Sequence, residues 1–194
     1  GQLYPSNLSI DSLIVGSDFT FNSTTASDYF KGNRSAGNTF FRTIGNFNII
    51  NSGLASGQGV IGVDSSAGSL SFSVGGNLVQ NGGSFSGILN GSGAATFNIT
   101  GMVDVNAGSF KGQNNIVYSN TGTITFTAGS IDFDGGLFSG FYSCNNSSLT
   151  GVFTINGNCK VNFTAASDEF TFIGIGKVGF DNNNLLLTLN ITGT

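Results

Sequence analysis

With 194 residues the chain is long enough for one sizeable hydrophobic core, but charged residues make up only 8% of it, about a third of their share in ordinary soluble domains. Six basic and ten acidic residues give a net charge of −4, so no basic stripe is available for nucleic acid. Hydrophobic residues reach 39% and include 19 Phe, which favours a folded chain over a disordered one. No stretch approaches the roughly 18 apolar residues of a membrane helix, so we expect no membrane insertion.

A short pattern recurs along the chain. It begins at a glycine, continues as a strand in which apolar and polar residues alternate, passes a glycine corner, and reaches a Phe on a second strand. A third alternating strand precedes the next opening glycine. The opening glycines are 25 to 31 residues apart, at Gly45, Gly76, Gly101, Gly129 and Gly157. This spacing predicts an all-β protein, a parallel β-solenoid of about six coils with a 25–31-residue period.

The pattern also divides the chain. We expect residues 1–15 to form an extended N-terminal arm or strand, and residues 16–194 to form a single solenoid domain with a C-terminal edge strand. The six coils are expected at 16–44, 45–75, 76–100, 101–128, 129–156 and 157–191. Residues 25–30 resemble residues 165–170, and the 140 residues between them equal five steps of 28. Short strands at 8–12-residue spacing also fit a β-sandwich, which stays open as the alternative.

Stacked repeats place equivalent residues in columns. One ladder of inward Phe residues is expected from Phe85, Phe110 and Phe138, and a second from Phe72, Phe97, Phe126 and Phe153. An Asn/Asp ladder is expected at one corner, from Asn81, Asn106, Asp134 and Asn162. These columns predict a core of stacked aromatic rings with a polar edge.

Three carboxylates are brought together by the same alignment. Asp104 and Asp132 share an outward column and Asp134 stands at the neighbouring corner, so the three form a candidate cation site, for example for Ca²⁺. Lys160 follows in the column and could instead compensate Asp132 alone in a solvated ion pair. The chain has no histidine and only six dispersed basic residues, so we predict no catalytic residues, no cofactor and no enzyme. A polysaccharide-cleaving solenoid enzyme stays open as a third interpretation.

Cys144 and Cys159 are the only cysteines. Cys159 falls in an inward column and Cys144 follows the second strand of the preceding coil, so we predict a disulfide that links adjacent layers. Sparing, even use of cysteine fits an oxidised, extracellular protein. The alternative is two buried free thiols in a cytosolic protein.

Both end segments are among the most apolar strands of the chain. We predict that they are assembly strands that add to neighbouring subunits, because ordinary repeat arrays end in polar caps. The alternative is that each pairs with its own end coil as a simple edge strand. The residues concerned are Leu8, Ile10, Leu13 and Val15 at the start, and Leu185, Leu187, Leu189 and Ile191 at the end.

The repeat G-x-h-x-h-N-G-G-x-F, with h apolar, covers residues 45–164 and resembles the coils of secreted bacterial β-solenoid adhesins and autotransporter-like surface proteins. The resemblance implies an extracellular or cell-surface, non-enzymatic protein. Together with the apolar ends, it leads us to expect a structural subunit that assembles head to tail with copies of itself into a fibre or surface layer by β-strand addition. The alternative is a monomeric adhesin or carbohydrate-binding passenger, so glycans are a second class of partner.

Overall fold

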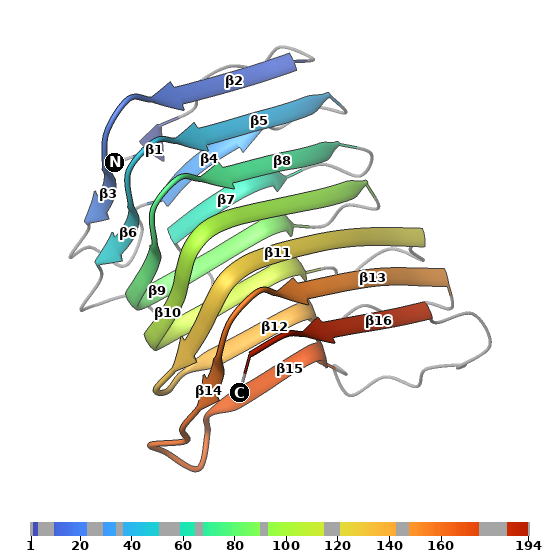
Figure 1. Cartoon of the computed structure of the whole chain (residues 1–194). Coiled ribbons are helices and arrows are strands. Elements are labelled where there is room, and N and C mark those ends of the chain that lie inside the picture. The colour runs from blue at the N-terminus through green and yellow to red at the C-terminus, as the bar shows by residue number, and fades with distance from the viewer. Residues whose placement is uncertain are drawn as a thin grey trace.

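The computed structural model describes residues 2–3, 10–22, 29–33, 37–50, 59–64, 68–89, 93–114, 121–142, 148–174 and 186–193. Every element in these ranges is a β-strand, and every strand pair among them is parallel. The strands of one turn lie on those of the next, so the chain winds as a β-solenoid (Figure 1). The prediction of a parallel solenoid is confirmed, and the β-sandwich is wrong because it needs antiparallel pairs.

Three parallel stacks of strands form three faces. The first face contains β2 (Ile10–Val15), β5 (Asn38–Thr43), β8 (Ser69–Val74), the starts of β10 (Ala94–Asn114) and β11 (Thr121–Phe133), β13 (Ser148–Ile155) and β16 (Leu186–Ile191). The second contains β3 (Phe19–Asn22), β6 (Phe47–Ile50), the start of β9 (Leu78–Leu89), later parts of β10 and β11, and β14 (Cys159–Val161). The third contains β1 (Gln2–Leu3), β4 (Tyr29–Asn33), β7 (Gly59–Asp64), the ends of β9 and β10, β12 (Leu137–Tyr142) and β15 (Glu169–Gly174).

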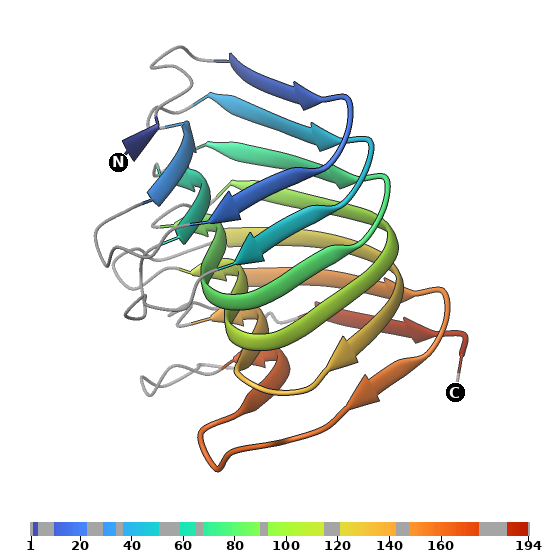
Figure 2. The same cartoon turned by 90° about the vertical axis from the view of Figure 1, so that its left-hand side faces the viewer.

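In the part of the chain that the structure describes, the solenoid has about four turns. Four stretches, in which every residue is described, each pass through all three faces. They are 68–89, 93–114, 121–142 and 148–174. The separate strands β1–β7 extend the same three stacks at one end, and β16 closes the first face at the other (Figure 2). The six coil boundaries stay a prediction. Within residues 1–15, β1 pairs with β4 and β2 pairs with β5.

Phe side chains fill the interior in the predicted ladders. Phe110 lies fully buried between Phe85 and Phe138, with ring centroids 4.9 and 5.1 Å away and interplanar angles of 3° and 7°. Strand pairing places Phe72, Phe97, Phe126 and Phe153 in the second ladder. The match between the two ends of the sequence has a structural counterpart, because Phe30 and Phe170 stand in the same column as Phe110. Alternation of apolar and polar residues therefore predicted the core correctly.

The corner between the second and third faces requires glycine in successive turns. Gly108 and Gly136 both have φ of +84°, a region that residues with a Cβ rarely adopt. A Cβ on Gly108 would lie 2.3 Å from the carbonyl oxygen of Gly83, and one on Gly136 would lie 2.5 Å from that of Gly108. Bare backbone thus lets adjacent turns approach at this corner.

Two ladders of polar side chains join the turns. Two steps of the predicted one are present, because Asn106 donates to Asn81 at 2.9 Å and Asn162 donates to Asp134 at 3.2 Å. The other lies between the first and second faces, and each of its side chains accepts from a backbone N–H of the next turn. Its acceptors are Asp18, Asn46 and Asn77, at 2.7, 2.8 and 2.8 Å. These bonds satisfy corner amide groups that the strands leave unpaired.

Candidate functional sites

The three predicted carboxylates lie on the outer surface of the second face. Asp104 pairs in register with Asp132, and Lys160 contacts Asp132 and Asp134, with Nζ to Oδ1 distances of 2.9 and 3.2 Å. Lys160 therefore compensates two carboxylates, where the sequence suggested Asp132 alone. In the described ranges no three or more His, Cys, Asp or Glu side chains are grouped to hold a metal. Asp132 and Lys160 line a groove of about 470 Å³.

The charges of this cluster are coupled. Burial raises the pKa of Asp104, with a smaller contribution from the charges of Asp132 and Asp134, while a hydrogen bond from Asn106 opposes the change. Hydrogen bonds from Asn162 and Lys160 lower the pKa of Asp134. Hydrogen bonds to Asp132 and Asp134 raise the pKa of Lys160. At neutral pH the cluster is thus an exposed ion-pair network, and such networks contribute modestly to stability.

Cys159 is a half-buried free thiol in this structure. It pairs with Ile131 in register, as the inward column predicted, and burial raises the pKa of its thiol. Cys144 lies outside the described residues, so the disulfide stays a prediction. Counting free thiols by mass spectrometry in protein from an oxidising compartment would test it.

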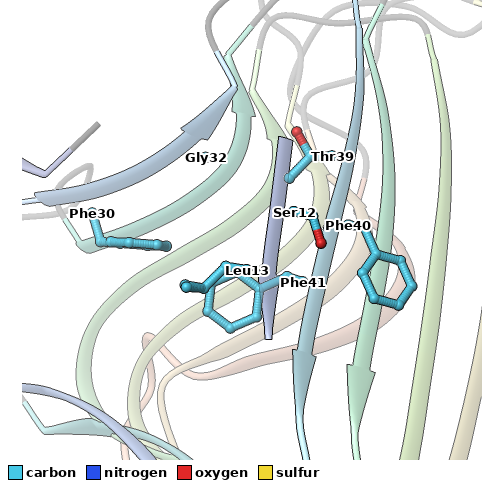
Figure 3. Close-up of a pocket in the computed structure, with 7 residues that line it drawn as sticks. All are labelled: Ser12, Leu13, Phe30, Gly32, Thr39, Phe40 and Phe41. Carbon is cyan, nitrogen blue, oxygen red and sulfur yellow. The ribbon is translucent and has the colours of Figure 1, made fainter. Parts of the chain in front are cut away.

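At the N-terminal end of the first face, β2 pairs with β5 alone among the described strands. Leu13 and Val15 are half-buried, whereas Phe41 and Thr43, their partners in β5, are buried. Figure 3 shows Leu13, Phe30 and Phe41 around a cavity of about 10 Å³, with Phe40 pointing away from them. This cavity is large enough for about one water molecule, and it does not form a ligand site. Leu8 lies outside the described residues, as does the side chain of Ile10.

At the C-terminal end, β16 pairs with β13 alone in the part of the chain that the structure describes. Leu189 and Ile191 continue the columns of Phe153 and Ile155, which are buried, yet they are 44% and 42% exposed. Val161 and Phe163 near the same end are 37% and 57% exposed. Leu185 lies outside the described residues, as does the side chain of Leu187. Both ends thus present apolar residues of the interior columns beside an unpaired strand edge.

Sequence reasoning missed a pocket at the corner between the second and third faces. Its lining includes Lys111, which is only 7% exposed and whose Nζ lies 4.1 Å from the ring centroid of Tyr142. Burial lowers the pKa of Lys111, and the charge of Glu169 partly opposes this. Tyr142 and Glu169 belong to later turns, so only the strand register could have brought them beside Lys111. The strand register places Lys31 in the same column as Lys111, so two basic residues in one column were an available signal.

Comparison with protein-family models, with curated proteins and with solved structures found no match. Within the described residues there is no helix with the length and apolar character needed to cross a membrane.

Proposed function

We propose that this protein is a non-enzymatic structural subunit that assembles head to tail into an extracellular fibre or surface layer. The observation that carries the proposal is the pair of open ends. Among the described strands, β2 at one end and β16 at the other each pair on one side only, and each lies next to partly exposed residues of the interior columns. Edge strands in this state are templates for pairing with another chain.

Stacking would place β16 of one subunit against β2 of the next. The backbone edges supply hydrogen bonds, and Leu189 and Ile191 would meet Leu13 and Val15 in continuation of the interior columns. Because the two ends differ, the contact is heterologous and does not close, so it produces a polymer of indefinite length. Because β2 already pairs with β5, strand addition would occur by docking of complete end turns, with β2 as the exposed edge strand of its own end turn.

The extracellular location rests on the sequence. Sparing use of cysteine, few charged residues and the resemblance to secreted solenoid repeats all support it. A contact that uses so few charges should also resist high salt, since screening weakens only charged interactions.

Substitutions on β16 provide a sharp test. Leu189→Lys with Ile191→Lys introduces two charges into the apolar end and should abolish assembly, because a buried unpaired ammonium is strongly unfavourable. Thr188→Lys with Asn190→Lys is the matched control, since both residues are exposed and alternate with the first pair on the same strand. The two variants carry equal charge and differ in the face that carries it.

Analytical ultracentrifugation and negative-stain electron microscopy would measure the outcome. We expect fibres from the unsubstituted chain and from the control, and monomers with a native circular dichroism spectrum from the Leu189/Ile191 variant. Unsubstituted protein that stays monodisperse at high concentration would contradict the proposal and favour a monomeric displayed adhesin. Equal assembly of the two variants would show that these ends are not the interface.

A further inference from the structure

The corner pocket has the construction of a ligand site. Its volume is about 340 Å³, and its lining includes Gly83, Gly108 and Gly136, one from each of three successive turns. The volume lies at the lower end of the range for small-molecule sites, roughly 300 to 1,000 Å³, and suits a single ring.

Lys111 is the most unusual residue of the lining. Its side chain is more than nine-tenths buried, and the ring of Tyr142 faces its ammonium group at 4.1 Å. Lys111 lines the pocket, and its ammonium group is not one of the buried, unpartnered polar atoms of the described residues, which are the Thr39 hydroxyl and the Gln80 side-chain oxygen. An ammonium group has three donors, so a ligand in the pocket could accept hydrogen bonds from Lys111.

One wall of the pocket is held rigidly before any ligand arrives. The carboxylate of Asp168 accepts from the backbone N–H of Gly136 at 2.9 Å, and from the N–H groups of Thr164 and Ala165 at 2.7 and 2.6 Å. It also accepts from the Thr164 hydroxyl at 3.1 Å. The bond to Gly136 ties the segment before β15 to the corner between the second and third faces. A preformed wall lowers the ordering cost of binding.

The charges and surfaces of the lining select the ligand class. Asp168 stands in the wall and the charge of Glu169 acts on Lys111, so two negative charges would repel a ligand anion. Neutral hydroxyl and ring oxygens can accept from Lys111 without that repulsion. Leu137 and the ring of Tyr142 supply apolar surface, and Ser109 and Ser167 supply hydroxyl groups. Polar edges around an apolar face match the two kinds of surface on a sugar ring.

We propose that this pocket binds one ring of a neutral saccharide, with Lys111 donating to its oxygen atoms and Leu137 and Tyr142 against its C–H face. The site does not depend on the proposed assembly, because its lining includes no residue of β2 or β16. In a fibre it would be repeated once per subunit. The monomeric Leu189/Ile191 variant should bind the same sugar, so failure of one proposal leaves the other testable.

The test uses a panel of methyl pyranosides of glucose, galactose, mannose and N-acetylglucosamine, with glucuronate as the acidic comparison. Saturation-transfer NMR would detect binding to the full chain, and calorimetry would measure it. Ser167→Tyr places a ring at the exposed rim of the pocket and should block binding. Thr125→Tyr is the matched control, because Thr125 is exposed on the first face away from the pocket.

Lys111→Met tests the donor directly. We expect at least about a tenfold loss of affinity, the loss typical of removing a hydrogen bond from a charged group. Because this change removes a buried charge, the variant should fold, and thermal unfolding would check it. If the Lys111→Met variant fails to fold, the Ser167→Tyr variant still tests whether the pocket binds the sugar.

Binding of at least one neutral sugar that Ser167→Tyr abolishes and Thr125→Tyr preserves supports the site. No binding at millimolar sugar, binding of glucuronate alone, or binding that survives Ser167→Tyr would overturn it.

Discussion

Phe110→Ala removes a ring from the middle of the aromatic core. Phe110 is fully buried and stacks on Phe85 and Phe138, at 4.9 and 5.1 Å. Its edge-to-face contacts with Phe97 and Phe126 have centroid distances of 5.9 and 6.1 Å. Truncating a buried Phe typically costs about 3 to 5 kcal/mol. With contacts on both sides and little freedom for parallel strands to collapse into the space, we expect the upper part of that range.

This loss would be a large share of the free energy of unfolding, which is roughly 5 to 15 kcal/mol for a typical domain. Urea unfolding followed by circular dichroism would measure it on a non-assembling background. Phe163→Ala is the control, since that ring is 57% exposed, and we expect a loss below about 1 kcal/mol. Each turn contacts only its neighbours, so Phe110→Ala should also broaden or split the transition. A loss below about 1 kcal/mol for Phe110→Ala would refute the assignment of this column to the core.

Two further predictions concern polar groups. Thr39 is 3% exposed, and its hydroxyl has no hydrogen-bond partner among the residues that the structure describes. Thr39→Val should therefore raise the free energy of unfolding by about 1 kcal/mol, measured by calorimetry. Thr43→Val, which loses a hydrogen bond to the Gly45 carbonyl at 3.3 Å, should lower it, and equal shifts would contradict the reasoning. Hydrogen bonds from the backbone of Gly136 and then Ala165 lower the pKa of Asp168. Its stabilisation should therefore be complete above the ordinary carboxyl pKa of about 3.9 and disappear as pH falls through its lowered value. Asp168→Asn should flatten the acid part of a melting temperature against pH curve, and an unchanged acid slope would show that this carboxylate does not contribute.

The regular part of the fold could be predicted because each turn of the solenoid corresponds to one repeat of the sequence. Alternation in segments such as 70–74 and 95–99 defines inward and outward residues, and glycines mark the corners, so both Phe ladders and the Asn81–Asn106 ladder were correct. The ladder of Asp18, Asn46 and Asn77 was missed because its side chains bind backbone N–H groups. The alternation of apolar and polar residues does not indicate bonds of this kind. Lys111 was missed for a related reason. Its neighbours come from other turns, and their distance depends on the exact register.

The steps between stacked strands also determine how such a chain can change in length. Leu70 stands over Ala95 and Leu78 over Val103, so residues 76–100 form one repeat that begins and ends at equivalent positions. Removing all 25 residues from 76 to 100 would join β8 to the opening glycine of the next repeat and leave every remaining column aligned. We expect such a chain to fold with one turn fewer, shorter along the stack by about 4.8 Å, which small-angle scattering on a monomeric background would test. Duplication or loss of single repeats is therefore an accessible evolutionary route for this fold, whereas a shift by one residue would reverse the inside and outside of every strand that follows.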